Sequence, residues 1–243
     1  MNTGEAVDDG SARRFDHVRE LDGLRGIAVA AVVVYHLWPD VLPGGFIGVD
    51  VFFVLSGFLL SALLVHEAER TGRVGFGAFM VRRVRRLLPA TLLVLGAIAL
   101  YAATWANDVE LARLRRHVFG SLTYSINWLF IADGTTYTDV VAGASPLRHV
   151  WSLAIEEQFY LMLAVVVAAL VRLGGATHVR RRLILGGGIL AGVSAVWMIA
   201  LSLSGASLAR TYFGTDTRMQ AMLIGVAIGA WKGDELLGRR LPG

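Results

Sequence analysis

The segment VWSLAIEEQFYLMLAVVVAALV, residues 150–171, decides the fold class. It is long enough to cross a bilayer, since about 20 mostly apolar residues in a helix span a hydrocarbon core of ~30 Å. Comparable stretches occupy residues 45–65, 87–106 and 183–204, and two more, 21–38 and 211–231, reach this length by including charged residues near one end. The sequence therefore predicts an all-α, polytopic bundle of about six transmembrane helices.

The overall composition agrees with a membrane protein. Of the 243 residues, 55% are hydrophobic and 17% are charged, which is more apolar and less ionic than an ordinary soluble domain. The sequence has no cysteine, which excludes a disulfide framework and a thiol nucleophile. The net charge of +4 raises nucleic acid or an anionic surface as the partner. Because the arginines flank the apolar stretches, we expect the lipid bilayer and no nucleic acid.

The distribution of Lys and Arg predicts the topology. The apolar run at 118–131 is too short to span, so we expect an interfacial or re-entrant segment there. With that segment outside, 17 of the 23 basic residues fall on one side, whereas a spanning segment would give 13 against 10. Cytoplasmic loops collect basic residues. We therefore predict a protein of the cytoplasmic membrane with both termini on the cytoplasmic side and an outer loop at about 107–148. Cytoplasmic tails at 1–20 and 233–243 are expected to flank a membrane domain at 21–232.

Ionisable side chains within apolar spans cost ~2.5–3.5 kcal/mol on insertion scales and are therefore candidate functional residues. Arg25 and His36 lie eleven residues apart, which is about three helical turns and places both on one face of the first span. A turn-rich link at residues 39–45 brings Asp50 to a similar depth as His36. This pattern predicts a general base, His36, whose imidazole Asp50 orients. A snorkelling arginine and a structural His–Asp pair would give the same pattern.

Two adjacent carboxylates, Glu156 and Glu157, lie near the outer end of the span at 150–171. Adjacent helical residues point about 100° apart, so we expect the two side chains to have different roles. An alternative is that both are solvated in a cavity. Polar and aromatic residues precede them: His149, Trp151 and Ser152. The spacing of these His and Glu residues does not match a zinc site, so we expect no metal.

An arginine cluster, Arg82, Arg83, Arg85 and Arg86, lies just before the span at 87–106. Guanidinium groups bind phosphates well. Two interpretations stay open: the cluster sets the topology and binds anionic lipid headgroups, or it binds a phosphate-rich donor such as coenzyme A.

Two further polar positions complete the set. Ser56 lies in the middle of a span, where serine usually packs or bonds to the backbone, and Asp216 and Arg218 lie at the outer end of the last span, where such a pair is usually structural.

Taken together, these residues resemble the acyltransferase-3 family of bacterial membrane O-acyltransferases, which modify cell-surface polysaccharides, lipids and some secondary metabolites. Five motifs carry the resemblance, which runs from about residue 19 to residue 231. They are Arg25 and His36 with ten residues between them, the segment GVDVFFVLSGF at 48–58, the arginines and proline of 82–89, the segment HVWSLAIEEQFY at 149–160, and TDTR at 215–218.

The resemblance implies an acyl-CoA donor, acetyl-CoA being the first expectation, and an acceptor hydroxyl at the outer face. In this scheme His36 is the general base and Asp50 assists it. Glu156 or Glu157 orients the acceptor or supports His36, and Arg25 stabilises charge deeper in the bundle. The expected coenzyme A ligands are Arg82, Arg83 and Arg86, and the expected supporting residues are Ser56, His149, Trp151, Ser152, Asp216 and Arg218.

Family members contain more helices than these spans, so we expect a C-terminally shortened member. The alternatives from other functional classes are a transporter or flippase, in which the intramembrane charges form a substrate path, and a non-catalytic partner subunit.

Overall fold

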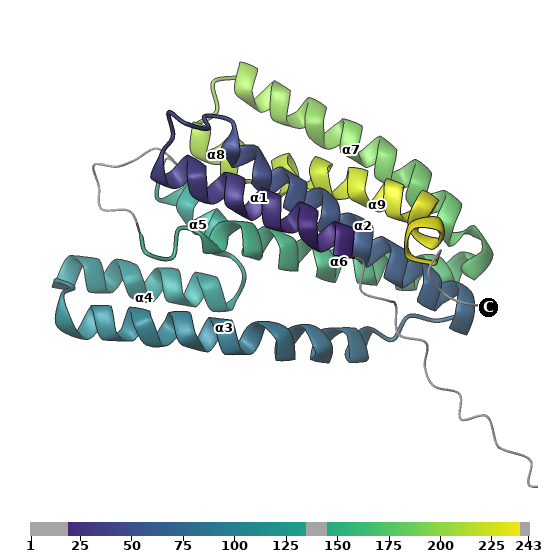
Figure 1. The fold of residues 1–243 in the computed structure, drawn as a ribbon, viewed down its shortest axis with the longest axis horizontal. Coiled ribbons are helices and arrows are strands. Elements are labelled where there is room, and N and C mark those ends of the chain that lie inside the picture. Colours follow the sequence, from purple (N-terminus) through teal and green to yellow (C-terminus); the bar gives the residue numbers. More distant parts are fainter. Residues whose placement is uncertain (1–18, 135–144, 239–243) are drawn as a thin grey trace, which may run out of the picture.

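The structure is a computed structural model that describes residues 19–134 and 145–238, and every regular element in these ranges is a helix (Figure 1). The long helices are α1 (Arg19–Leu37), α2 (Gly48–Thr71), α3 (Phe76–Thr104), α6 (Val150–Gly174), α7 (Val179–Leu203) and α9 (Thr215–Gly238). The short elements are η1 (Gly45–Ile47), α4 (Asp108–Leu122), α5 (Ile126–Ala132), η2 (Ala176–His178) and α8 (Leu208–Phe213). The predicted all-α class is confirmed. Most of the two predicted tails, residues 1–18 and 239–243, lie outside the described residues.

Four helical stretches are long and apolar enough to cross a membrane: Gly45–Thr71, Phe76–Thr104, Val150–Gly174 and Ala176–Leu203. They coincide with the four predicted spans that lack charged residues at their ends. The other two predicted spans are helical as α1 and α9, but their charged residues keep them outside this group. The third span also begins earlier than predicted, so the arginine cluster lies within α3 rather than before it.

Two predicted segments are divided in the structure. The last predicted span breaks at Gly214, whose extended backbone (φ −66°, ψ 129°) separates α8 from α9. The run at 118–131 breaks between α4 and α5, where Tyr124 adopts a positive φ of 52°. This second break means that the outer segment forms no continuous helix of spanning length, in agreement with the prediction from its size.

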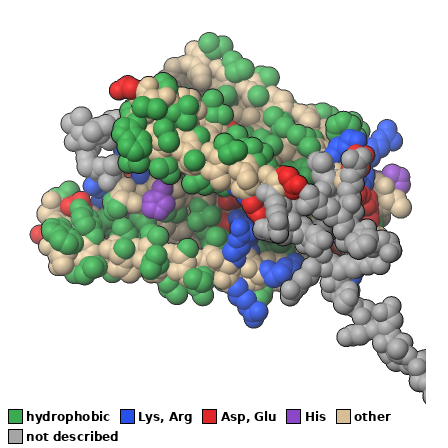
Figure 2. Space-filling view, viewed as in Figure 1, with side chains coloured by type: hydrophobic (Ala, Val, Ile, Leu, Met, Phe, Trp, Pro, Cys, Tyr) green, Lys and Arg blue, Asp and Glu red, His purple; other side chains and the backbone are tan. Residues whose placement is uncertain are grey.

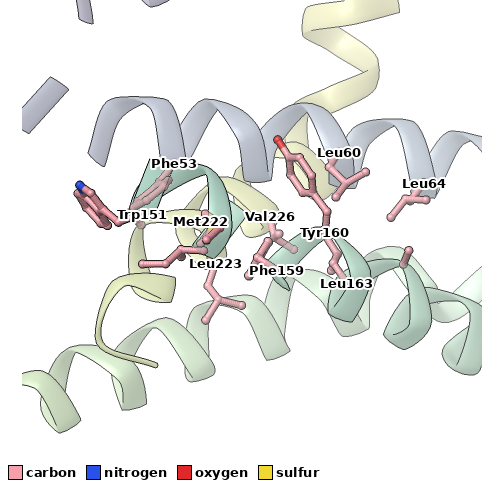
Figure 3. Close-up of a cluster of buried hydrophobic side chains, with 14 of the residues drawn as sticks. Phe53, Leu60, Leu64, Trp151, Phe159, Tyr160, Leu163, Met222, Leu223 and Val226 are labelled. Carbon is pink, nitrogen blue, oxygen red and sulfur yellow. The ribbon is translucent and has the colours of Figure 1, made fainter. Parts of the chain in front are cut away.

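The buried core lies where α2, α6 and α9 meet (Figure 3). Figure 3 shows Phe53 and Leu60 of α2, Phe159 of α6, and Met222 and Val226 of α9 directed into one cluster. This packing places the polar residues of α2 and α6 at the same interface.

α3 lies at the edge of the bundle and runs beside α4 (Figure 1). Almost none of the most apolar stretch of α3 is buried inside the protein: Ile98 is buried, whereas Leu88, Leu92 and Leu93 are exposed. Hydrophobic side chains also cover much of the face in Figure 2. An apolar helix without protein around it is stable in lipid, so these surfaces fit the membrane assignment.

α2 and α9 approach each other through glycines. Gly225, Gly229 and Gly233 recur every four residues on α9, and a Cβ atom built on any of them would lie far inside contact distance of α2. On α2, Gly57 faces the backbone of Met222 in the same way. Small residues at this spacing let helix backbones pack closely in membranes. The position of α2 therefore depends on these glycines.

We predict that Gly229→Ala lowers the thermal stability of the detergent-solubilised protein, at a cost of about 1–3 kcal/mol, because the new methyl group would collide with the Phe58 carbonyl oxygen. The matched control is Gly188→Ala on α7, where a Cβ atom would meet no atom within 4 Å. Equal melting temperatures for the two variants would contradict this account of the α2–α9 contact.

Candidate functional site

A cavity of about 550 Å³ lies among α1, α2 and α6. Its wall is mostly apolar, built from valine, phenylalanine and leucine side chains of the three helices. The polar residues in the wall are His36, Arg148, His149, Ser152 and Glu156. Sequence reasoning named four of these five residues, His36 from one motif and the other three from the segment at 149–160, and the structure places them around one space.

The His36 imidazole is oriented by its own helix. Its Nδ1 lies 2.7 Å from the carbonyl oxygen of Val32. A carbonyl oxygen only accepts hydrogen bonds, so Nδ1 carries the proton in the neutral ring and Nε2 is the basic nitrogen. The carbonyl of Val32 therefore orients the ring.

Asp50 lies against Arg218 of α9, with Asp50 Oδ1 3.4 Å from Arg218 Nη1. The guanidinium also donates from Nε to the carbonyl oxygen of Tyr212 at 3.0 Å and lies over the Tyr212 ring. Asp50 and Arg218 therefore join α2 to the start of α9, a pairing that the sequence analysis did not predict. The predicted support of His36 by Asp50 stays a prediction.

Glu156 is bound from two sides within the bundle. Its Oε1 accepts hydrogen bonds from the Ser56 hydroxyl of α2 and from the Tyr160 hydroxyl at 2.6 Å. The Tyr160 ring reaches toward α2 in Figure 3. Because Glu156 also lines the cavity, its carboxylate is fixed at the cavity wall. Ser56, expected to pack or to bond the backbone, instead bonds to this carboxylate.

Glu157 forms a buried ion pair with Arg83 of α3. Glu157 Oε1 lies 2.6 Å from Arg83 Nε and 2.5 Å from Arg83 Nη2. The same guanidinium lies 3.9 Å above the Tyr160 ring and 3.6 Å from Glu156 Oε2. The adjacent carboxylates thus differ in surroundings, as their directions on the helix predicted: Glu157 is buried against α3, whereas Glu156 borders the cavity.

The position of Arg83 corrects one prediction. We expected Arg82, Arg83 and Arg86 together to bind coenzyme A phosphates, but the Arg83 side chain is largely buried and occupied by Glu157. The helical period explains the difference, since Arg83 points toward α6 while Arg82 and Arg86 point outward and are exposed. Of the three arginines, Arg82 and Arg86 therefore remain the candidates for a phosphate site on α3.

The other candidate residues have structural surroundings. Arg25 Nη1 lies 3.9 Å from Asp22 on the same helix, and it does not line the cavity. Asp216 is held by Arg210 through two contacts, at 2.8 and 2.5 Å. Trp151 is buried among aromatic rings. Among the residues that the structure describes, no group of three or more His, Asp and Glu side chains is placed to hold a metal ion.

Sequence reasoning missed two residues of the site. Arg148 lines the cavity, and its position directly before the singled-out His149 was the signal available. Tyr160 belongs to the motif at 149–160 but was not a candidate residue. Its hydroxyl contacts Glu156, and its ring contacts Arg83. A tyrosine one helical turn after a glutamate is a detectable pattern, because residues four apart lie on one helix face.

Comparisons with known proteins agree with the resemblance. A family profile described as an acyltransferase domain matches residues 18–235. The chain is 39% identical over 212 residues to the peptidoglycan O-acetyltransferase OatA of Listeria monocytogenes, covering 87% of this chain and 33% of that protein. It is 37% identical over 205 residues to the O-acetyltransferase OatA of Staphylococcus aureus, covering 84% and 33%. The chain spans about a third of the length of these curated relatives. No solved structure matches it.

We predict that Arg83→Ala destabilises the protein by about 3–5 kcal/mol, because it leaves the Glu157 carboxylate buried without its cation. The matched control is Arg85→Ala, which removes an exposed guanidinium two residues away and should change stability by less than about 0.5 kcal/mol. Thermal unfolding of both variants in the same detergent measures the difference. Similar losses for the two would show that the buried pair does not hold α3.

Proposed function

The chain belongs to the acyltransferase-3 family, and from this premise we propose that it transfers an acyl group, acetyl in the first instance, from acyl-CoA to a hydroxyl group. The supporting observation is the cavity among α1, α2 and α6, which has an imidazole and a fixed carboxylate in an otherwise mostly apolar wall. Apolar walls suit an acyl chain and the aliphatic part of a pantetheine arm, and a few placed polar groups suit the reacting atoms.

In this proposal His36 acts as the general base. Its Nε2 removes the proton from the acceptor hydroxyl as the oxygen attacks the thioester carbonyl carbon. The carbon–sulfur bond then breaks, and the thiolate of coenzyme A takes the proton from the imidazolium. A neutral imidazole suits this role because its unprotonated ring nitrogen accepts the proton.

Glu156 supports the charge that develops on His36 or accepts a hydrogen bond from the acceptor. Its hydrogen bonds from Ser56 and Tyr160 keep the carboxylate in one place, so it needs little reorganisation during the reaction. A carboxylate left free to rotate would lose this advantage.

The donor phosphates are proposed to bind to Arg82 and Arg86. Both side chains are exposed on the first turns of α3, and Figure 2 shows basic side chains gathered over this part of the molecule. Guanidinium groups bind phosphate through paired hydrogen bonds. In the proposed topology, with the termini in the cytoplasm, this end of α3 faces the cytoplasmic pool of acyl-CoA.

The acceptor is proposed to be a hydroxyl of a cell-envelope polysaccharide, presented at the outer face of the cytoplasmic membrane. The Listeria relative is a peptidoglycan O-acetyltransferase, and the polar part of the cavity wall includes Arg148 and His149, directly before α6. In the proposed topology this end of α6 faces outward.

We predict that His36→Ala abolishes coenzyme A release from acetyl-CoA, by at least about 100-fold, in lipid vesicles supplied with soluble peptidoglycan fragments. The matched control is His178→Ala in η2, an exposed histidine that contacts Thr177 and should leave the rate unchanged. Transfer that survives in His36→Ala would exclude His36 as the base. No release from the native chain would show that these residues do not suffice for the reaction.

For the donor site, we predict that Arg82→Ala with Arg86→Ala raises the KM for acetyl-CoA about tenfold or more with little change in kcat, because the removed charges bind phosphate away from the reacting atoms. Arg181→Ala, which removes another exposed arginine, is the control. If the double variant instead loses binding to anionic lipid vesicles while its KM is unchanged, the cluster serves the membrane surface.

A further inference from the structure

A second hydrogen-bonded set of polar side chains lies outside the cavity site, where α4, α5 and the segment before α6 meet. Nδ1 of His117 lies 3.0 Å from the Ser145 hydroxyl, and Nε2 of the same ring lies 3.1 Å from Asp133 Oδ2. Only 2% of His117 and 7% of Ser145 are exposed. The three residues come from separate parts of the chain, so the fold assembles the set.

The hydrogen-bond pattern fixes the direction of the protons. A carboxylate only accepts, so Nε2 of His117 donates to Asp133, and in the neutral ring Nδ1 is then the acceptor for the Ser145 hydroxyl. Burial lowers the pKa of His117 below its ordinary value, which keeps the ring neutral, with an unprotonated Nδ1, at neutral pH. A serine that donates to a neutral imidazole held by a carboxylate is the arrangement that activates a hydroxyl as a nucleophile.

The surroundings extend this arrangement on both sides. Oδ1 of Asp133 lies 2.7 Å from Arg116 Nη1, so the carboxylate is held between a cation and the imidazole. On the other side, Ser145 is followed directly by Pro146, which lines the cavity. Ser145 therefore belongs to the segment that forms the edge of the cavity.

We propose that Ser145, His117 and Asp133 form a second acyl-transfer centre, with Ser145 as the nucleophile toward an acyl thioester. The Ser145 oxygen attacks the carbonyl carbon while its proton moves to His117 Nδ1. The carbon–sulfur bond breaks, the thiolate leaves with that proton, and an ester forms on Ser145. Attack by an acceptor hydroxyl returns the serine. This inference rests on the proposed function only for the identity of the donor.

A purely structural role would use the same three contacts to fasten the segment before α6 to α4. Ser145 also accepts a hydrogen bond from the backbone N–H of Leu147 at 3.3 Å, which is a common turn arrangement. The two roles differ in the chemical reactivity of the hydroxyl. A structural serine does not react with an electrophile that is selective for activated serines, whereas a nucleophilic serine does.

The test is therefore labelling of the purified native chain with a fluorophosphonate, followed by identification of the modified residue by peptide mass spectrometry. We expect modification at Ser145, and at least about a tenfold lower labelling rate in Asp133→Asn, which keeps the size of the side chain and removes its charge. Ser121→Ala is the matched control, because this hydroxyl lies one turn after His117 and bonds to a carbonyl of its own helix. It should label like the native chain.

Several outcomes would overturn the proposal: no label on Ser145 in a folded protein, label elsewhere that persists in Ser145→Ala, or an unchanged rate in Asp133→Asn. Thermal unfolding of each variant separates loss of reactivity from loss of fold. The reagent requires neither acyl-CoA nor an acceptor, so failure of the proposed function would leave this result interpretable. In addition, the native chain incubated with acetyl-labelled acetyl-CoA and no acceptor should acquire label on Ser145, and Ser145→Ala should not.

Discussion

An arginine and a glutamate can be buried between membrane helices only if each neutralises the other, and the pair between Arg83 and Glu157 meets this condition. The apolar stretch of α3 is otherwise almost unburied by protein, so this pair and the Tyr160 ring beneath the guanidinium form a principal attachment of α3 to α6. Fixing Arg83 also fixes the rotation of α3 about its axis. The neighbouring Arg82 and Arg86 consequently point away from the bundle.

The same constraint acts on α6. Because Glu157 points toward α3, its neighbour Glu156 is turned about 100° toward α2 and the cavity. There it meets Ser56, whose helix is held in place by close backbone contact with the glycines of α9. The position of the Glu156 carboxylate thus depends on the Arg83–Glu157 ion pair on one side and on the close packing of α2 against the glycines of α9 on the other. The ion pair sets the direction of Glu156 on α6, and the helix packing sets the position of its partner Ser56 on α2.

Much of the fold could be predicted from the sequence because lipid imposes a simple rule on length and hydropathy. The four spans free of terminal charges follow from that rule, and so does the non-spanning character of the outer segment. The rule does not predict the breaks at Tyr124 and Gly214, since they depend on how short helices pack rather than on hydropathy. Contact partners escaped it too: Asp50 binds Arg218 of α9, which a pattern of residues along α1 and α2 cannot reveal.

Glu156 connects α3 with the cavity among α1, α2 and α6. One of its oxygens lies 3.6 Å from Arg83, which belongs to the helix that carries the outward-facing arginines, and the same side chain lines the cavity that contains His36. In the proposed reaction, a donor bound to the exposed arginines of α3 and His36 as the base would be separated by much of a ~30 Å core. Part of that distance is covered by the contact between Arg83 and Glu156, two charged side chains held in fixed positions, and by the cavity that Glu156 lines. Any displacement of α3 would therefore act on the Glu156 carboxylate, which lines the same cavity as His36.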